Sequence, residues 1–453
     1  MTRPRFLFGA LALVAAAASL PMTALASGGV FTSSQGAMTV TDHKVAISLS
    51  ATSTSIWDEL HYTGAPADFA WVMPVKGQAE LAVGGGYVFS MLDEYSPVLA
   101  SSPYIHCYCN DDECTMPVGI QQKEPHSTPI GSHEEVGPYD VVRVSSSDPQ
   151  GLSTWFATNG YAVPADVAPM IDAYVAEGYD FFAVRLKSGA AISDMRPIRV
   201  TTPGLSPHLP LRLMRAGSGS VAPLTLWIVG STRWAPKNMP SFAVDASSVV
   251  WDWDTQSSNY SELVTTGFAG LPAPGWLIEN ARAMSGDAFE EIALQTGYYT
   301  GSATEAAAAA QADYQALVGA FGSALVTVTR LRADLPHDAL TLDLELEAGA
   351  NDEQPNPVAA STKGMQPECP IKPGTTTTSA STGGGDATTG STSSGSGGGG
   401  GNGADVGGGG CSVSAGGGSV ALAPVAALVA ALATRRRRAR RSTSSVSSSR
   451  TPS

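Results

Sequence analysis

The sequence predicts an α+β fold, made mainly of antiparallel sheet with three or four helices. Ten stretches between residues 30 and 350 carry the β-branched and aromatic alternation that is typical of half-buried strands. Short Gly/Pro connections separate several of them, and three other stretches repeat apolar residues at helical spacing. Hairpin-length connections favour antiparallel pairing over the alternating strand-helix order of a doubly wound sheet.

The predicted elements follow from these patterns in chain order. One connection, TGAPA after Tyr62, predicts a hairpin between the second and third strands. Asp148 and Asp166 are placed to cap the first two helices, and Gly178 to end the second. The predicted strands are Thr39–Ser50, Ser55–Tyr62, Asp68–Val75, Tyr139–Ser145, Asp180–Lys187, Ile198–Thr202, Pro210–Arg215, Leu224–Val229, Leu325–Leu331 and Ala339–Glu347, and the predicted helices are Gly151–Thr158, Val167–Glu177 and Thr304–Phe321.

Composition divides the 453 residues into four parts. We expect a signal peptide (1–26), an ectodomain (27–350), a disordered Gly/Ser/Thr-rich stalk (351–410) and a sorting tail (411–453). The Cys-rich, Pro-punctuated stretch 101–138 suggests lobes of residues 27–138 and 139–350. Residues 28–374 hold 17 Lys and Arg against 38 Asp and Glu. Such an acidic body argues against a nucleic-acid partner, because phosphate binding needs clustered basic side chains.

Both ends of the chain carry addressing signals. Arg3 and Arg5 precede an apolar stretch that ends at the A-x-A motif before Ser27, so we expect export and cleavage between Ala26 and Ser27. At the other end Gly410-Cys411 is followed by an apolar segment, residues 420–433, and then by arginines. Because positive charge stays on the cytoplasmic side, this order predicts a membrane tether through the C-terminal helix. The arginines of the sorting tail are Arg435, Arg436, Arg437, Arg438, Arg440 and Arg441.

Four cysteines remain when Cys411 is assigned to the tail, and in an exported protein four cysteines favour two disulfides. Three of them, with His106, could instead hold zinc, although the C-x-C-x4-C spacing is not a common zinc pattern. We expect two of the clustered cysteines to pair locally and the third to pair with Cys369, with the connectivity left open. The clustered candidates are Cys107, Cys109 and Cys114.

Two family resemblances emerge from these residues. The Gly-Cys, apolar and poly-Arg order resembles the MYXO-CTERM tail of myxobacterial exported proteins, which implies a sorting protease, removal of the helix and surface retention through Cys411. The segments YDVVRVSSSDPQGLSTWFATNGYAVP, VAPMIDAYVAEGYDFFAVRLK and MRPIRVTTPGLSPHLPLRLM, with DFAWVMPV earlier, resemble the exported bacterial family called domain of unknown function 2330. That family often has Cys directly after the signal, where this chain has Ser27. The resemblance implies no activity.

No short catalytic motif stands in the chain: a nucleophile elbow, a P-loop, H-E-x-x-H and an EF-hand loop are all absent. The aromatic residues of the Gly-Leu-x-x-Trp and Phe-Phe-Ala-Val segments are expected to pack in the core. The seven histidines are weak candidates for a general base without a partner in view; they are His43, His61, His106, His126, His133, His208 and His337.

Three acidic groups in the sequence are candidate binding sites. Asp343, Glu345 and Glu347 alternate with leucines and predict a solvated strand face, with calcium binding as the alternative. Asp252 and Asp254 alternate with Trp251 and Trp253, an arrangement that occurs in carbohydrate sites. The third group predicts a solvated turn and comprises Asp111, Asp112 and Glu113.

We therefore expect an exported protein at the cell surface or outer membrane with a non-enzymatic binding or envelope-structural ectodomain and no cofactor. Its expected partners are the export machinery, a sorting protease and the membrane, together with an unidentified surface ligand. One alternative is a secreted hydrolase or metal-dependent enzyme without a short sequence signature. Another is a calcium- or carbohydrate-binding adhesion module.

Overall fold

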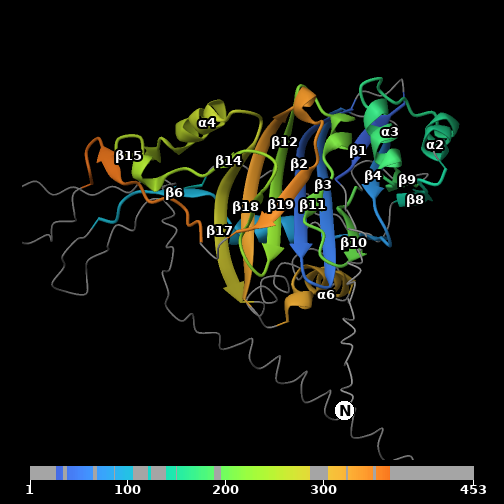
Figure 1. Cartoon of the computed structure of the whole chain (residues 1–453). Helices are drawn as coiled ribbons and strands as arrows, with labels where there is room; N and C mark the ends of the chain where they lie inside the picture. Colours follow the sequence, from blue (N-terminus) through green and yellow to red (C-terminus); the bar gives the residue numbers. More distant parts are fainter. Residues whose placement is uncertain are drawn as a thin grey trace, which may run out of the picture. The chain divides into compact units, whose positions relative to one another are not determined.

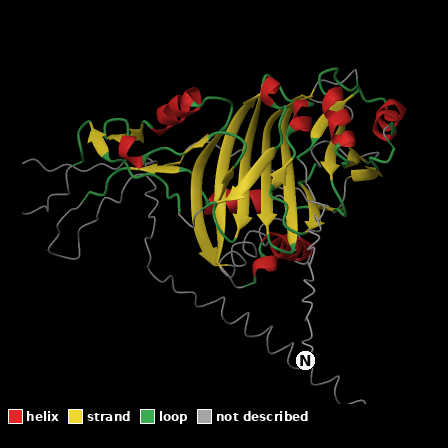
Figure 2. Ribbon diagram, viewed as in Figure 1, coloured by secondary structure: helices red, strands yellow, loops and turns green. Residues whose placement is uncertain are grey.

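The computed structural model describes most of the expected ectodomain and the residues just after it. The described residues are 27–33, 38–64, 69–85, 87–105, 121–123, 139–148, 150–187, 195–285, 305–322, 325–349 and 353–367. They form a mixed α+β fold, as predicted, with mostly antiparallel sheets and five α-helices (Figures 1 and 2). No helix among them is long and apolar enough to span a bilayer.

An eight-stranded sheet is the largest element of the fold (Figure 2). Its strands are antiparallel except at the β14–β17 and β12–β2 pairs, which are parallel. A tight turn joins β2 to β3, in which Ser50 Oγ accepts the Ser53 amide hydrogen at 3.0 Å. The order across the sheet is β14 (Ser241–Phe242), β17 (Trp276–Ser285), β18 (Leu325–Pro336), β12 (Val221–Gly230), β2 (Met38–Leu49), β3 (Ser53–Gly64), β10 (Ile198–Pro203) and β5 (Glu80–Val83).

A second, four-stranded sheet is antiparallel throughout. Its order is β1 (Gly29–Thr32), β4 (Phe69–Val75), β9 (Asp180–Leu186) and β8 (Tyr139–Val144), so strands from both sides of residue 138 share it. The predicted hairpin between the second and third strands is wrong, because β3 belongs to the large sheet and β4 to this one. Strand β4 is buried along its whole length, so it needs cover on both faces, which a two-stranded hairpin does not give.

Three small sheets complete the strands. The first has the order β11 (His208–Leu209), β19 (Leu344–Ala348) and β13 (Trp234–Pro236). The second has the order β16 (Ser257–Ser258), β15 (Val250–Asp252) and β20 (Ser361–Lys363). The third pairs β6 (Leu99–Ser101) with β7 (Gln121–Lys123). The 3-10 helices are η2 (Arg212–Arg215), η3 (Ala246–Ser248), η4 (Gly319–Phe321) and η5 (His337–Ala339).

Three sequence predictions fail in these small elements. The strand expected at residues 210–215 is largely η2, and the strand expected from residue 339 starts only at Leu344, after η5. The stalk was expected from residue 351, yet β20 pairs in parallel with β15 and residues 353–367 belong to the body. The polar, Pro-rich composition of this segment did not predict an ordered strand, because backbone hydrogen bonds hold the segment in place rather than apolar side chains.

The five helices are α1 (Tyr87–Tyr95), α2 (Gly151–Asn159), α3 (Ala168–Ala176), α4 (Tyr260–Gly270) and α6 (Glu305–Leu317). The three predicted helices are confirmed as α2, α3 and α6, whereas α1 and α4 were missed. Gly160 ends α2 with φ +76° and Gly178 follows α3 with φ +80°, the left-handed conformation that glycine adopts without strain. The predicted Asp caps are wrong, because Gln150 and Val167 occupy the N-cap positions.

The two large sheets pack face to face, and helices cover their outer faces. One buried cluster joins Ile47 and Leu226 of the eight-stranded sheet to Trp71 of β4. On the far side of the four-stranded sheet lie α2 and α3, and α1 and α6 cover the far side of the eight-stranded sheet. The aromatic pairs Trp155-Phe156 and Phe181-Phe182 lie in or against these cores, as predicted.

Candidate functional site

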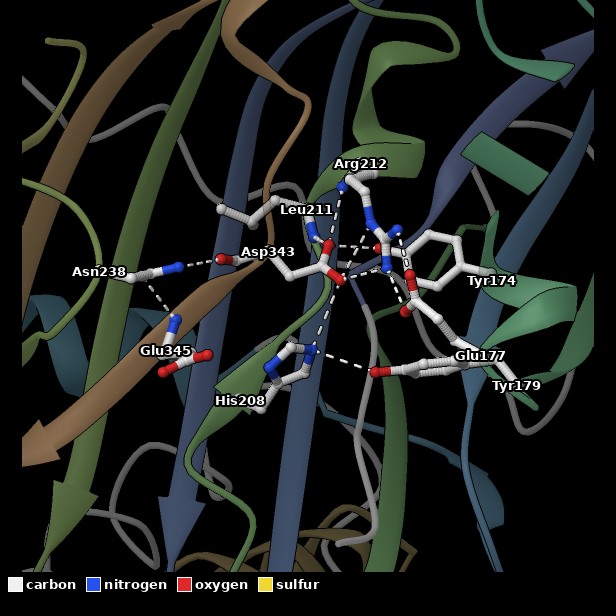
Figure 3. Close-up of polar contacts among 9 residues, drawn as sticks. All are labelled: Tyr174, Glu177, Tyr179, His208, Leu211, Arg212, Asn238, Asp343 and Glu345. Atoms are coloured by element: carbon white, nitrogen blue, oxygen red, sulfur yellow. Dashed lines mark hydrogen bonds and ion pairs between the residues drawn. The ribbon is translucent and has the colours of Figure 1, made fainter. Parts of the chain in front are cut away.

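A buried polar cluster surrounds the carboxylate of Asp343, just before β19 (Figure 3). Its Oδ1 accepts hydrogen bonds from Tyr174 Oη at 2.5 Å and from the backbone amides of Leu211 at 2.9 Å and Arg212 at 3.3 Å. Its Oδ2 accepts from Arg212 Nε at 3.1 Å and Nη2 at 2.7 Å. Helix α3, η2 and the start of β19 therefore meet on one side chain.

Arg212 extends this cluster to the protein surface. Its guanidinium lies 3.8 Å from the ring centroid of Tyr174 and donates to both carboxylate oxygens of the half-exposed Glu177, at 2.8 and 2.7 Å. On the other side, His208 Nε2 lies 3.5 Å from Asp343 Oδ2 and 3.1 Å from Tyr179 Oη. The guanidinium thus bridges two carboxylates while its π face rests on an aromatic ring.

The surroundings shift the pKa values of the cluster in opposite directions. Burial opposes the charged form of Asp343, but hydrogen bonds from His208, Arg212 and Tyr174 hold the pKa of this carboxyl well below its usual range. Burial and the Asp343 charge together raise the pKa of Tyr174 and of Tyr179. Tyr174 is therefore a neutral phenol beside the carboxylate of Asp343 and the guanidinium of Arg212.

This geometry makes the Asp343 cluster a structural clamp. A carboxylate has about four lone-pair sites, and five donors already converge on Asp343. No lone pair faces a substrate or a cation. The cluster ties the helical layer beside the four-stranded sheet to the small β11–β19–β13 sheet.

The predicted acidic strand face is therefore only partly right. Glu345 and Glu347 are exposed and Leu344 and Leu346 are buried, as the alternation predicts. Asp343 instead points inward, with 9% of its surface exposed, because the turn before β19 breaks the alternation. Glu345 pairs with Lys237 at 2.9 Å, so the three carboxylates do not converge. Within the described ranges no group of His, Cys, Asp and Glu is arranged to hold a metal ion.

The carbohydrate interpretation of the alternating Trp/Asp segment is wrong. Trp251 and Trp253 are buried and pack edge to face, so neither ring is available to stack on a sugar. Asp252 pairs with Lys363 at 3.2 Å, and Asp254 Oδ1 accepts the backbone amide of Met365. These contacts attach β20 and the segment after it to β15 and the turn that follows β15.

Most of the addressing and disulfide candidates lie outside the described residues. They are Ala26, Cys107, Cys109, Cys114, Cys369, Gly410, Cys411, Arg435, Arg436, Arg437 and Arg438, together with the loop acids Asp111, Asp112 and Glu113. Ser27, the expected first residue of the mature chain, is described and fully buried.

One histidine joins a serine and an aspartate that are distant in the sequence. His337 Nε2 lies 2.8 Å from Asp166 Oδ2, and its Nδ1 lies 3.1 Å from Ser218 Oγ. Asp166 also accepts from Arg215 Nε at 3.0 Å, and Ser218 Oγ lies 3.1 Å from the carbonyl of Arg215. The hydrogen bonds from His337 and Arg215 outweigh slight burial and lower the pKa of Asp166.

A cleft of about 640 Å³ opens between α4, the loop after it and the end of β18. Its apolar wall comprises Tyr260, Val264, Phe268 and Leu271. Arg332 and Asp334 lie at its polar side, 3.2 Å apart, with Ser261 and Thr265 on the helix. A cleft of this size with few polar groups is typical of small-molecule sites.

The cleft was not predicted from the sequence because its main wall, α4, was not predicted. The helix has a readable signal: Ser258 Oγ accepts the Tyr260 amide hydrogen, Glu262 lies in the first turn, and Tyr260, Val264 and Phe268 recur every four residues. The side chains of β18 that complete the cleft lie about 70 residues away in the chain, and that juxtaposition has no local signature.

Comparison with known proteins identifies the family. Residues 21–329 match the family described as uncharacterized protein conserved in bacteria, DUF2330. The chain belongs to this family. No curated protein and no solved structure matches the chain.

Proposed function

We propose that this DUF2330 protein is an exported, surface-anchored binding protein, and that a small amphipathic ligand occupies the cleft beside α4. The observation that carries the proposal is the cleft itself, with its continuous wall of aromatic and aliphatic side chains beside one ion pair. Apolar burial supplies affinity in such sites, and a few polar groups set orientation.

Charge narrows the class of ligand. Residues 28–374 carry 17 basic against 38 acidic residues, so the field of the body disfavours anions at a distance. Within the cleft, Arg332 is already paired with Asp334, whose side chain is 37% exposed. A neutral or cationic polar end attached to an apolar body fits this arrangement.

The binding proposal is tested with N-phenyl-1-naphthylamine, a neutral apolar dye whose fluorescence rises in apolar surroundings. Thr265 lines the cleft and Thr266, its neighbour on α4, does not, although both are exposed. Thr265→Trp should weaken dye binding at least about tenfold by filling the cleft, and Thr266→Trp should leave it unchanged. Equal binding by both variants would reject the cleft as the site.

Export and anchoring are the second half of the proposal. The A-x-A motif before Ser27 and the Gly-Cys, apolar, poly-Arg tail support it, with the sorting protease, the export machinery and the membrane as partners. Protease added to intact cells should remove the body. A body that stays intact under conditions that degrade a surface control overturns the display proposal.

A second function, acyl transfer, is favoured by the Ser218–His337–Asp166 arrangement. With Asp166 accepting the Nε2 proton, the Nδ1 atom of His337 is free of hydrogen and can take the Ser218 hydroxyl proton once that hydroxyl turns away from the Arg215 carbonyl, to which it donates. A fluorophosphonate probe should then label wild-type protein and the Ser220→Ala control but not Ser218→Ala. Labelling of none of them removes this candidate.

A further inference from the structure

Two buried ionisable side chains lie together on the eight-stranded sheet with incomplete hydrogen bonding. His43 of β2 and Asp58 of β3 are each 1% exposed, and the distance from His43 Nδ1 to Asp58 Oδ1 is 3.8 Å, too long for a hydrogen bond. Both ring nitrogens of His43, and Oδ1 of Asp58, have no hydrogen-bond partner. Buried polar atoms are nearly always paired, so Asp58 Oδ1 and the acceptor nitrogen of the neutral His43 ring point to a donor that the uncut chain does not supply.

The chain segment beside them starts at Ser27. Its Oγ donates to Asp58 Oδ2 at 3.0 Å, and the Gly28 amide donates to the same oxygen at 3.1 Å. The Ser27 nitrogen lies 3.3 Å from the carbonyl oxygen of Pro210. Covalent geometry places that nitrogen within about 7 Å of Asp58 Oδ2. Ser27 is fully buried.

Gly28 and Gly29 pack so closely against neighbouring atoms that neither position has room for a side chain. A Cβ on Gly28 would lie 2.2 Å from Trp71 Nε1, and one on Gly29 would lie 2.1 Å from the carbonyl oxygen of Leu213. Strand β1 then continues in register against β4, with Gly29 opposite Val72. The start of the expected mature chain is therefore inserted between core elements and does not lie on the surface.

We propose that Asp58 and His43 form a binding site for the α-ammonium group that signal cleavage creates on Ser27. Before cleavage the Ser27 nitrogen is an amide with one hydrogen; afterwards it carries three and a positive charge. The acceptors are the carbonyl of Pro210, the carboxylate of Asp58 and a ring nitrogen of His43. The ligand is the chain's own terminus, so export completes the fold.

This site holds the terminus rather than using Ser27 as a nucleophile. An N-terminal serine can attack a carbonyl with its own amine as base, but its hydroxyl must reach a substrate. Here the hydroxyl is buried and donates to a carboxylate. The inference rests on the proposed export, because only cleavage after Ala26 places the ammonium at this position.

The test compares the full chain started at Ser27 with the same chain started at Ala26, each released from a fusion that leaves the stated first residue. An aldehyde reagent selective for N-terminal amines is added, and the product is followed by mass spectrometry. In the Ser27 chain we expect labelling at least about a hundredfold slower in buffer than in urea, because the amine is held in the core. The Ala26 chain should react at similar rates in both.

A second readout checks Asp58. Asp58→Asn should lower the melting temperature by more in the Ser27 chain than in the Ala26 chain, whereas Asp338→Asn, at an exposed carboxylate, should affect both alike. Rapid labelling of the folded Ser27 chain would overturn the proposal. That result does not depend on whether the Asp58→Asn variant folds. The first residue of protein recovered from exporting cells reports on export separately.

Discussion

Replacing Asp343 by Asn is the sharpest test of the clamp between the helical layer and β19. The amide keeps an oxygen for the Leu211 and Tyr174 donors but presents its NH2 group to Arg212, which loses two charge-assisted hydrogen bonds, at 3.1 and 2.7 Å. Each such bond contributes about 1.5–3 kcal/mol, and breaking a buried ion pair costs about 3–5 kcal/mol. We expect the free energy of unfolding to fall by about 3–5 kcal/mol.

The stabilising contribution of Asp343 should also depend on pH. Hydrogen bonds hold the pKa of Asp343 below its unfolded value of about 3.9, so its stabilising contribution is present above that pH and is lost as pH falls through the folded pKa. Wild type should therefore lose stability more steeply than Asp343→Asn below pH of about 4.

Urea unfolding at pH 7 and at several acidic values measures both effects. Glu345→Gln, which breaks only the exposed pair with Lys237, is the matched control and should leave the midpoint unchanged. A neutral-pH loss below about 1 kcal/mol for Asp343→Asn, or an unchanged acid slope, refutes the clamp.

Other substitutions test other parts of the structure. Gly28→Ala should lower stability by about 1–3 kcal/mol, because its Cβ would clash with Trp71, whereas Gly270→Ala, with nothing within 4 Å, should be neutral or slightly stabilising; thermal unfolding separates them. Arg330→Met strands the buried carboxylate of Glu279 and should cost about 3–5 kcal/mol in urea unfolding, and a loss near zero would contradict that pairing. Mass spectrometry without reductant should show the hydrogens lost in forming two disulfides, and stoichiometric zinc in the purified ectodomain would contradict this.

Local sequence pattern was sufficient to predict two kinds of element. One kind pairs with an element that is next to it in the sequence, and the other buries a face of apolar side chains. The β-branched alternation found β2 and β3, and helical spacing found α2 and α3. Gly178 was predicted as a helix end because the required backbone conformation is a property of the residue itself.

Long-range pairing decided what the sequence could not show. Asp343 has an ordinary strand-like sequence around it, and only its meeting with Tyr174 and Arg212, more than 130 residues away, turns it inward. Strand β20 has no apolar alternation and is held by its ladder with β15. The cleft likewise needs α4 and β18 to come together.

The most direct test of the binding proposal is native mass spectrometry of the protein purified from the cells that export it. We expect wild type and Thr266→Trp to carry a bound small molecule that Thr265→Trp lacks, because only the last substitution fills the cleft between α4 and β18. The same adduct on all three proteins would contradict the account, as would no adduct on wild type.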